Sequence, residues 1–262
     1  MPRRWPLHGL LFVLTAGSTF LVAGPAYAVA IMGILVFHEM GHYLQARRYG
    51  VPATLPYFIP FPFSLFGTLG AVIRMNNLGA DRRVLFDIGV TGPLAGLVVA
   101  IPATVWGLAH SAVVPTATLS GGSIELGDSL FFRGMVWLTL GSVPEGYDVL
   151  LHPVAFAGWA GLFLTALNLL PIGQLDGGHV TYALLGRYAY PVALAAMLAF
   201  IAVTVFVSPI WTLMVVLVLL IGLRHPPTAD DTVPLGRGRK AIGWASLAFF
   251  VLSFTPDPLT LG

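Results

Sequence analysis

Residues 26–48 read AYAVAIMGILVFHEMGHYLQARR, and this stretch decides the fold. Two histidines and a glutamate, in the HEMGH sequence over 38–42, stand inside an otherwise apolar run that ends in a pair of arginines. About 20 apolar residues are enough to cross a bilayer as a helix. An ionisable residue within such a helix is costly, so the cluster is a candidate functional site inside a membrane.

The composition of the whole chain agrees with a membrane protein. Of the 262 residues, 57% are hydrophobic and 9% are charged, whereas about a quarter of the residues of a soluble domain are charged. The basic residues form short pairs beside apolar runs, and no basic stripe with interleaved aromatics points to nucleic acid. There is no cysteine, so any metal must be held by His, Asp or Glu.

Apolar runs of membrane-spanning length recur along the chain and predict an all-α polytopic membrane protein with about six to seven transmembrane helices. The candidate spans are residues 5–23, 26–46, 88–109, 153–172, 188–207, 210–223 and 241–255. Gly24-Pro25 separates the first two, and Ser208-Pro209 is a predicted tight turn. We expect one membrane domain over residues 1–262, with a catalytic core at about 28–186 and C-terminal helices at about 188–255.

The distribution of basic residues predicts an orientation. If the N-terminus is cytoplasmic, twelve of the 13 basic residues fall on the cytoplasmic side, as the positive-inside rule requires. His42 then lies roughly 7 Å, and His38 roughly 14 Å, beneath the cytoplasmic surface at 1.5 Å per residue. The first run, with Arg3-Arg4 before it and Ala26-Tyr27-Ala28 after it, also resembles a cleavable signal peptide. The simplest expected location is a prokaryotic inner membrane.

Residues 51–74 are apolar but carry four prolines, which a helix interior would not accept. We expect a re-entrant extended or β segment near the active site, because irregular backbone at membrane depth survives only against protein or a water-filled cavity. Residues 66–73 are β-prone. They either offer an edge on which an unwound substrate pairs as a strand or serve only for packing.

The HEMGH cluster has the spacing of a metal site. Residues i and i+4 project from one face of a helix, so His38 and His42 can reach one ion, and Glu39 lies beside them to hydrogen-bond a water on that ion. This is the HExxH pattern of zinc hydrolases. The alternative is a polar cluster that holds helices together.

A catalytic zinc usually takes three protein ligands and a water, and the acids near the same membrane face are Asp176, Asp81 and Asp87. Asp87 is readily explained by the helix dipole and Asp81 by its arginine neighbours. Asp176 stands in an apolar turn without an evident charge partner, which favours it as the third ligand. Its alternative role is to cap a helix that starts near Gly177.

Three motifs in order carry a family resemblance: HEMGH over 38–42, GPLAG over 92–96, and the run NLLPIGQLDGG over 168–178. Together they resemble the site-2 protease family of intramembrane zinc metalloproteases, peptidase family M50. The resemblance implies one Zn²⁺ per chain on His38, His42 and Asp176, with Glu39 as the catalytic base and Asn168 orienting substrate or stabilising the oxyanion. Gly92 and Gly96 themselves are typical of close helix packing.

The resemblance also implies the activity, which is hydrolysis of peptide bonds in or near transmembrane segments of membrane-anchored proteins (regulated intramembrane proteolysis). We expect a membrane-anchored protein substrate and the lipid bilayer as partners. We see no room for the PDZ domain or CBS pair of other members, which leaves a place for an accessory regulatory protein. The alternatives are an inactive scaffold of the same family and a metal or proton transporter. His179 is either a partner of a zinc ligand or a helix-surface histidine.

Overall fold

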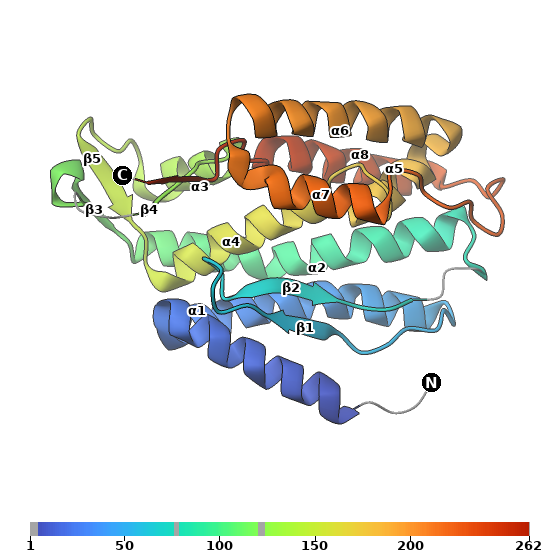
Figure 1. Ribbon diagram of the computed structural model, residues 1–262, viewed down its shortest axis with the longest axis horizontal. Helices are drawn as coiled ribbons and strands as arrows, with labels where there is room; N and C mark the ends of the chain where they lie inside the picture. The colour runs from blue at the N-terminus through green and yellow to red at the C-terminus, as the bar shows by residue number, and fades with distance from the viewer. Residues whose placement is uncertain (1–4, 76–78, 120–123, 262) are drawn as a thin grey trace.

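A computed structural model describes residues 5–75, 79–119 and 124–261 of the chain. Its helices lie side by side along the longest axis of the molecule, with short strands at one end and along one flank (Figure 1). Arg3 and Arg4, on which the orientation and signal-peptide predictions partly rest, lie outside the described residues.

The first helix, α1 (Trp5–Arg48), is two helical limbs joined at a kink. Ala23 and Gly24 have non-helical backbone angles, and Gly24 has a φ of 78°. Glycine reaches that conformation without the steric cost that other residues meet, and Pro25 then starts the second limb. The break predicted at Gly24-Pro25 is therefore confirmed. The second limb carries the HEMGH cluster.

The remaining helices follow in chain order. They are α2 (Arg82–Ala109), α3 (Leu130–Leu140), α4 (Pro153–Asn168), α5 (Asp176–Leu185), α6 (Ala189–Phe206), α7 (Thr212–Ile221) and α8 (Gly236–Ser253), with 3₁₀ turns η2 (Thr116–Leu119), η3 (Gly186–Tyr188) and η4 (Pro209–Trp211). Helix α5 was not among the predicted spans. It is short, at 10 residues, and its first turn contains two glycines that lower its intrinsic helix propensity.

Within the described residues, three helical stretches are long and apolar enough to cross a membrane: Trp5–Arg48, Arg82–Ala109 and Asp176–Phe206. Helices α3 and α4 and the stretch Pro209–Ile221 are apolar but shorter. The structure is thus mostly helical, as predicted, while the count of six to seven spans stays a prediction.

The proline-rich segment forms the extended hairpin expected of it. Strand β1 (Tyr57–Pro60) pairs antiparallel with β2 (Thr68–Val72), with Phe58 opposite Ala71 and a register shift before Pro60. The tip of the hairpin is anchored on α1. The Tyr27 hydroxyl donates to the Phe66 carbonyl oxygen at 3.0 Å, and the Ser18 hydroxyl donates to that of Gly67.

The expectation of an all-α fold is wrong for the segment between α2 and α4 and for the C-terminus. Strand β3 (Ala112–Pro115) pairs with β5 (Tyr147–Leu150), and β4 (Ile124–Leu126) pairs with β6 (Leu259–Leu261), both antiparallel. These strands have three or four residues each, too few to give a period-two pattern, and their partners are distant in sequence.

The core lies where the second limb of α1 meets α2 and α4. It includes Tyr27, Ile31, Ile34, Leu108 and Leu162, each at most 2% exposed. The outward faces of the helices are apolar as well, with Leu21, Phe206 and Leu220 more than three-quarters exposed. An apolar exterior around a packed interior is the surface that a bilayer accepts.

Candidate metal centre

Three side-chain atoms that can bind a metal, called the donors below, lie close together between α1 and α5. The Nε2 atoms of His38 and His42 lie 3.2 Å apart, and each lies 3.2 Å from Oδ2 of Asp176. Ligand atoms at about 2.0–2.2 Å from a tetrahedral zinc are about 3.3 Å from one another. The observed triangle therefore has the dimensions of three zinc ligands, although Asp176 is 138 residues from His38 in sequence.

The hydrogen bond that His42 makes favours a metal cation between the three side chains over direct hydrogen bonds among them. Its Nδ1 lies 2.7 Å from the carbonyl oxygen of Ile88, which can only accept, so Nδ1 carries the hydrogen. In the neutral ring, Nε2 then presents a lone pair to the Asp176 carboxylate. If both rings were protonated instead, two N–H groups would face each other across 3.2 Å. A metal ion satisfies all three donors at once, and the Ile88 carbonyl fixes the tautomer that binds it.

Two glycines of α2 make room for the two imidazoles. A Cβ on Gly92 would collide with three atoms of the His42 ring, and a Cβ on Gly96 would lie 3.2 Å from Nδ1 of His38. Close packing of α1 on α2 is also present, because a Cβ on Gly41 would lie 2.5 Å from the Thr91 carbonyl oxygen. The GPLAG motif thus shapes the ligand pocket in addition to the packing role predicted for it.

Asp176 is the first residue of α5, and its carboxylate faces the histidines. The helix N-cap is Leu175, which makes no side-chain capping bond, so Asp176 does not serve as the predicted alternative, a cap. The turn before α5 lies against the end of α4, where a Cβ on Gly177 would lie 2.5 Å from the Leu170 carbonyl oxygen. The glycine pair thereby allows the approach that brings Asp176 to the two histidines.

The two rival acids have other partners. Asp81 caps α2, its Oδ1 accepting from the Val84 N–H at 2.8 Å. Asp87 accepts from Arg239 of α8 at 2.7 and 2.8 Å and from the Tyr49 hydroxyl at 2.5 Å. The hydrogen bond to this carboxylate raises the pKa of Tyr49 above its ordinary value. Both acids therefore lie outside the donor triangle: Asp81 caps α2, and Asp87 links α2 to α8 and to Tyr49.

A cavity of about 260 Å³ opens onto the donors, and three groups of residues line it. They are the site residues His38, Glu39, His42, Asn168 and Asp176; the residues Ala71 and Val72 of β2 with Ile73 and Met75 beyond its end; and Gln174, Leu175 and His179. Every predicted site residue thus lines this cavity, together with the end of β2.

Glu39 and Asn168 flank the donors within this cavity. Glu39 is 5% exposed, and no described residue makes a hydrogen bond to its carboxylate, which leaves it available to a water or a substrate. Nδ2 of Asn168 lies 3.3 Å from Nε2 of His38, at the edge of the donor triangle. The arrangement combines a metal-binding triangle, a free carboxylate and an amide in one cavity.

Comparison with known families places this centre. Residues 26–209 match the family described as Peptidase family M50. The chain belongs to peptidase family M50. The matched residues contain all three donors, Glu39, Asn168 and the β hairpin, and the predicted resemblance is confirmed. With its apolar helices, this M50 chain is an integral membrane protein.

Several curated relatives of the M50 chain are plant proteins whose names place them in the chloroplast. "Probable zinc metalloprotease EGY1, chloroplastic" of Arabidopsis thaliana is 32% identical over 90% of this chain and 44% of its own length. The EGY2 and EGY3 proteins of Oryza sativa subsp. indica, which carry the same description, are 28% and 31% identical over 90% and 94% of this chain and 43% and 45% of their own lengths. The chain thus spans less than half the length of these relatives. No solved structure matches it.

The predicted enzyme class, a zinc metalloprotease, is the one that the M50 family and the names of these relatives carry. The sequence does not predict the contact of the Ile88 carbonyl with His42 or the contacts of Gly92 and Gly96 with the rings of His42 and His38. A signal for the second was present, because the four-residue spacing of the glycines equals that of His38 and His42 on the facing helix. Among the described residues, His179 bonds to His225 through Nδ1 and to none of the side chains of His38, His42 and Asp176.

Proposed function

We propose that this chain is an intramembrane zinc metalloprotease that hydrolyses peptide bonds in or near transmembrane segments of membrane-anchored proteins. The observation that carries the proposal is the triangle of His38, His42 and Asp176 donors, with edges of 3.2 Å, inside a cavity that also holds a free glutamate and a β strand. His38, His42 and Asp176 are the proposed ligands of one zinc ion, and the ion supplies a bound water with a pKa lowered toward neutrality.

Glu39 is the proposed general base. Its carboxylate takes a proton from the attacking water as the water oxygen bonds to the carbonyl carbon, and then delivers that proton to the nitrogen of the leaving amine as the peptide C–N bond breaks. Burial suits this role because little bulk water competes for the carboxylate in the cavity. Asn168 is the proposed donor to the carbonyl oxygen of the scissile bond, on which negative charge develops.

Strand β2 is the proposed docking edge for the substrate. A transmembrane substrate is helical, and its carbonyls become open to attack only when the helix unwinds. Ala71, Val72 and Ile73 line the same cavity as the donors, so a segment that pairs with β2 would run past the metal site. Proline at Leu69 or Val72 should lower cleavage while zinc stays bound, and unaltered cleavage by both variants would contradict the docking role.

The membrane arrangement that we propose is six to seven spans in one domain over residues 1–262, with the active site near the cytoplasmic face. Figure 1 supports one shared end for the basic loops, because the start of α1, the start of α2 and the segment between α7 and α8 lie at the same end of the bundle. There, N–H of Arg82 donates to the Asp230 carbonyl oxygen, and Arg239 pairs with Asp87. A prokaryotic inner membrane is the proposed location. The alternative is a plastid membrane, because the relatives are named as chloroplast proteins.

Zinc content and cleavage together test the proposal. The purified protein is reconstituted in liposomes with a panel of labelled single-span peptides, and the parent is compared with Glu39→Gln. The parent should hold about one zinc per chain and cleave, whereas Glu39→Gln should hold zinc and not cleave. Cleavage by Glu39→Gln would reject the base. A parent without zinc after metal supplementation would reject the enzyme in favour of the scaffold or transporter.

A further inference from the structure

A pair of histidines joins the metal cavity to a second cavity. His179 lies one turn after Asp176 on α5, is 7% exposed, and lines the metal cavity. Its Nδ1 lies 2.7 Å from Nε2 of His225, and the two rings are nearly perpendicular, at 81°. The contact links residues 46 positions apart in sequence.

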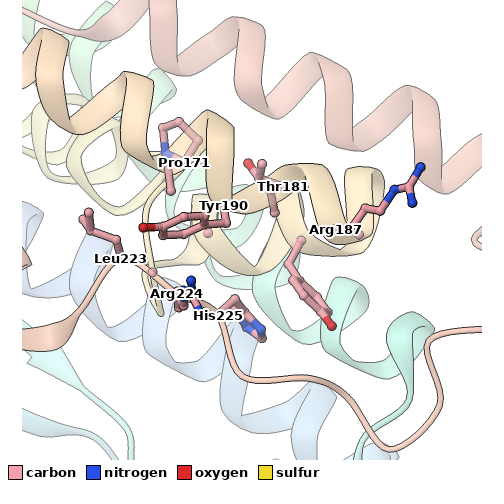
Figure 2. A pocket seen from close by; sticks show the side chains of 13 residues that line it. Pro171, Thr181, Arg187, Tyr190, Leu223, Arg224 and His225 are labelled. Carbon is pink, nitrogen blue, oxygen red and sulfur yellow. The ribbon is translucent and has the colours of Figure 1, made fainter.

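His225 comes from the segment between α7 and α8 and lines the second cavity, which has a volume of about 200 Å³ (Figure 2). Arg224, Tyr190 and Thr181 line this cavity as well, and Figure 2 shows His225 beside Arg224 on its wall. His179 thus lines only the metal cavity and His225 only the second cavity, and their hydrogen bond links the walls of the two cavities.

The hydrogen positions in this pair follow from its acceptors. Nδ1 of His225 lies 2.5 Å from the Pro226 carbonyl oxygen, which can only accept, so Nδ1 carries the hydrogen. In a neutral ring, Nε2 of His225 is then an acceptor, and its partner, Nδ1 of His179, must donate. The remaining nitrogen of His179, Nε2, is therefore left with a lone pair.

Several contacts hold His225 in this place. Its ring stacks on Tyr182 at 4.5 Å, and the Tyr182 hydroxyl donates to Asp231 at 2.7 Å. The chain before it lies against the turn that precedes α5, where a Cβ on Gly173 would collide with the Gly222 carbonyl oxygen. Burial lowers the pKa of His225 below its ordinary value, which keeps the ring neutral.

We infer that His225 is a positioning residue that fixes His179 as a neutral acceptor for a backbone N–H of the substrate in the metal cavity. The inference rests on the proposed protease function. An unwound substrate brings backbone N–H groups that have lost their helical acceptors, and an unpaired N–H in a buried site costs about 1–3 kcal/mol. Glu39 is engaged with the attacking water, so a second, uncharged acceptor is needed, and the Nε2 lone pair of His179 supplies it.

The segment after α7 thereby contributes to catalysis from outside the family match. That match ends at residue 209, whereas His179 lies inside it and His225 lies 16 residues beyond it. The C-terminal helices therefore do more than enclose the catalytic core, because they bring the residue that sets the tautomer of His179.

Two substitutions of His225 separate the hydrogen bond from the packing. His225→Phe keeps a ring on Tyr182 and removes the acceptor, whereas His225→Gln offers a side-chain oxygen near the position of Nε2. We expect kcat/KM for a cleaved single-span peptide to fall roughly 5- to 100-fold in His225→Phe and to recover most of that loss in His225→Gln, with zinc content unchanged in both. His110→Phe is the matched control, because His110 also stacks on an aromatic residue, Trp106, but is exposed and lines neither cavity.

Two further readouts test whether the effect runs through His179. His179→Phe should lose as much activity as His225→Phe, and the double variant should lose no more than either, which a merely structural role would not produce. In ¹⁵N spectra of the labelled histidines, His179 should be protonated at Nδ1 in the parent and in His225→Gln and should change in His225→Phe. Parent activity in His225→Phe, additive losses, or His179 protonated at Nε2 would each overturn the inference. Failure of the protease proposal is distinct, since it appears as a parent that neither binds zinc nor cleaves, and the spectra still decide the tautomer.

Discussion

Replacement of Gly92 by alanine should displace the proposed metal ligand His42, although no proposed ligand residue is itself substituted. The added Cβ would lie inside van der Waals contact of Nε2, Cδ2 and Cε1 of His42. Since ordinary carbon contacts are 3.5–4.0 Å, the ring must withdraw by more than about 1 Å. Metal sites tolerate errors of about 0.2 Å in ligand distance, so His42 should stop binding.

Alanine at two other glycines of this interface should lower the zinc affinity less than alanine at Gly92. A Cβ on Gly96 would lie 3.2 Å from Nδ1 of His38, a conflict that a shift of a few tenths of an ångström relieves. A Cβ on Gly33 would meet only a methyl of Val99 at 3.9 Å, which is ordinary contact. We expect zinc affinity to fall more than about 100-fold in Gly92→Ala, because loss of a partner outside the ligand shell alone costs 10–100-fold, to fall by less in Gly96→Ala, and to stay unchanged in Gly33→Ala.

The assay is competition for zinc between the detergent-purified protein and a chromophoric chelator, with helix content monitored by circular dichroism. A folded Gly92→Ala variant that holds zinc with parent affinity would refute the reasoning, and so would a larger loss in Gly96→Ala than in Gly92→Ala. The Gly33→Ala control excludes a general effect of alanine in these helices.

Three further changes test the rest of the site. Arg239→Ala leaves the buried carboxylate of Asp87, a residue 9% exposed, without its guanidinium partner. We expect the free energy of unfolding, measured by denaturation in detergent, to fall by about 1–3 kcal/mol and to recover in part in Arg239→Lys. An unchanged stability would contradict the role of the pair. Asn168→Ala should lower kcat about 10²–10³-fold at constant zinc content in the liposome assay, whereas loss of zinc would make Asn168 a support of the metal site instead. Phe66→Ala removes the ring that lies 5.7 Å from the ring of Phe163 on α4; we expect limited proteolysis at the hairpin to accelerate, and parent-like protection would show that the ring does not anchor it.

The sequence predicts the parts of this fold that depend on local patterns. The kink at Gly24-Pro25 and the extended hairpin at 51–74 follow from proline and glycine, whose backbone limits act within one or two residues. Strands β4 and β6 could not be predicted, because each has three residues and they pair across more than 130 positions of chain. Tertiary context alone decides such pairs.

The same division holds at the site. The spacing of His38 and His42 is local to one helix, so their shared face is predictable. The approach of Asp176 was suggested by its apolar surroundings and not by its distance in sequence. The link from His179 to His225 has no sequence signal, since it depends on where the segment after α7 crosses the turn before α5.

The first limb of α1 covers one edge of the β1–β2 sheet and leaves the other edge open. A two-stranded sheet has two open edges, and an unwound chain segment could pair with either of them. Here His8 of the first limb contacts the Pro56 carbonyl oxygen and the Tyr57 ring, and Phe12 packs against Phe58, so the β1 side is occupied from within the chain. A substrate strand can therefore pair only with the β2 edge, next to the cavity, because the first limb of α1 prevents pairing at the β1 edge.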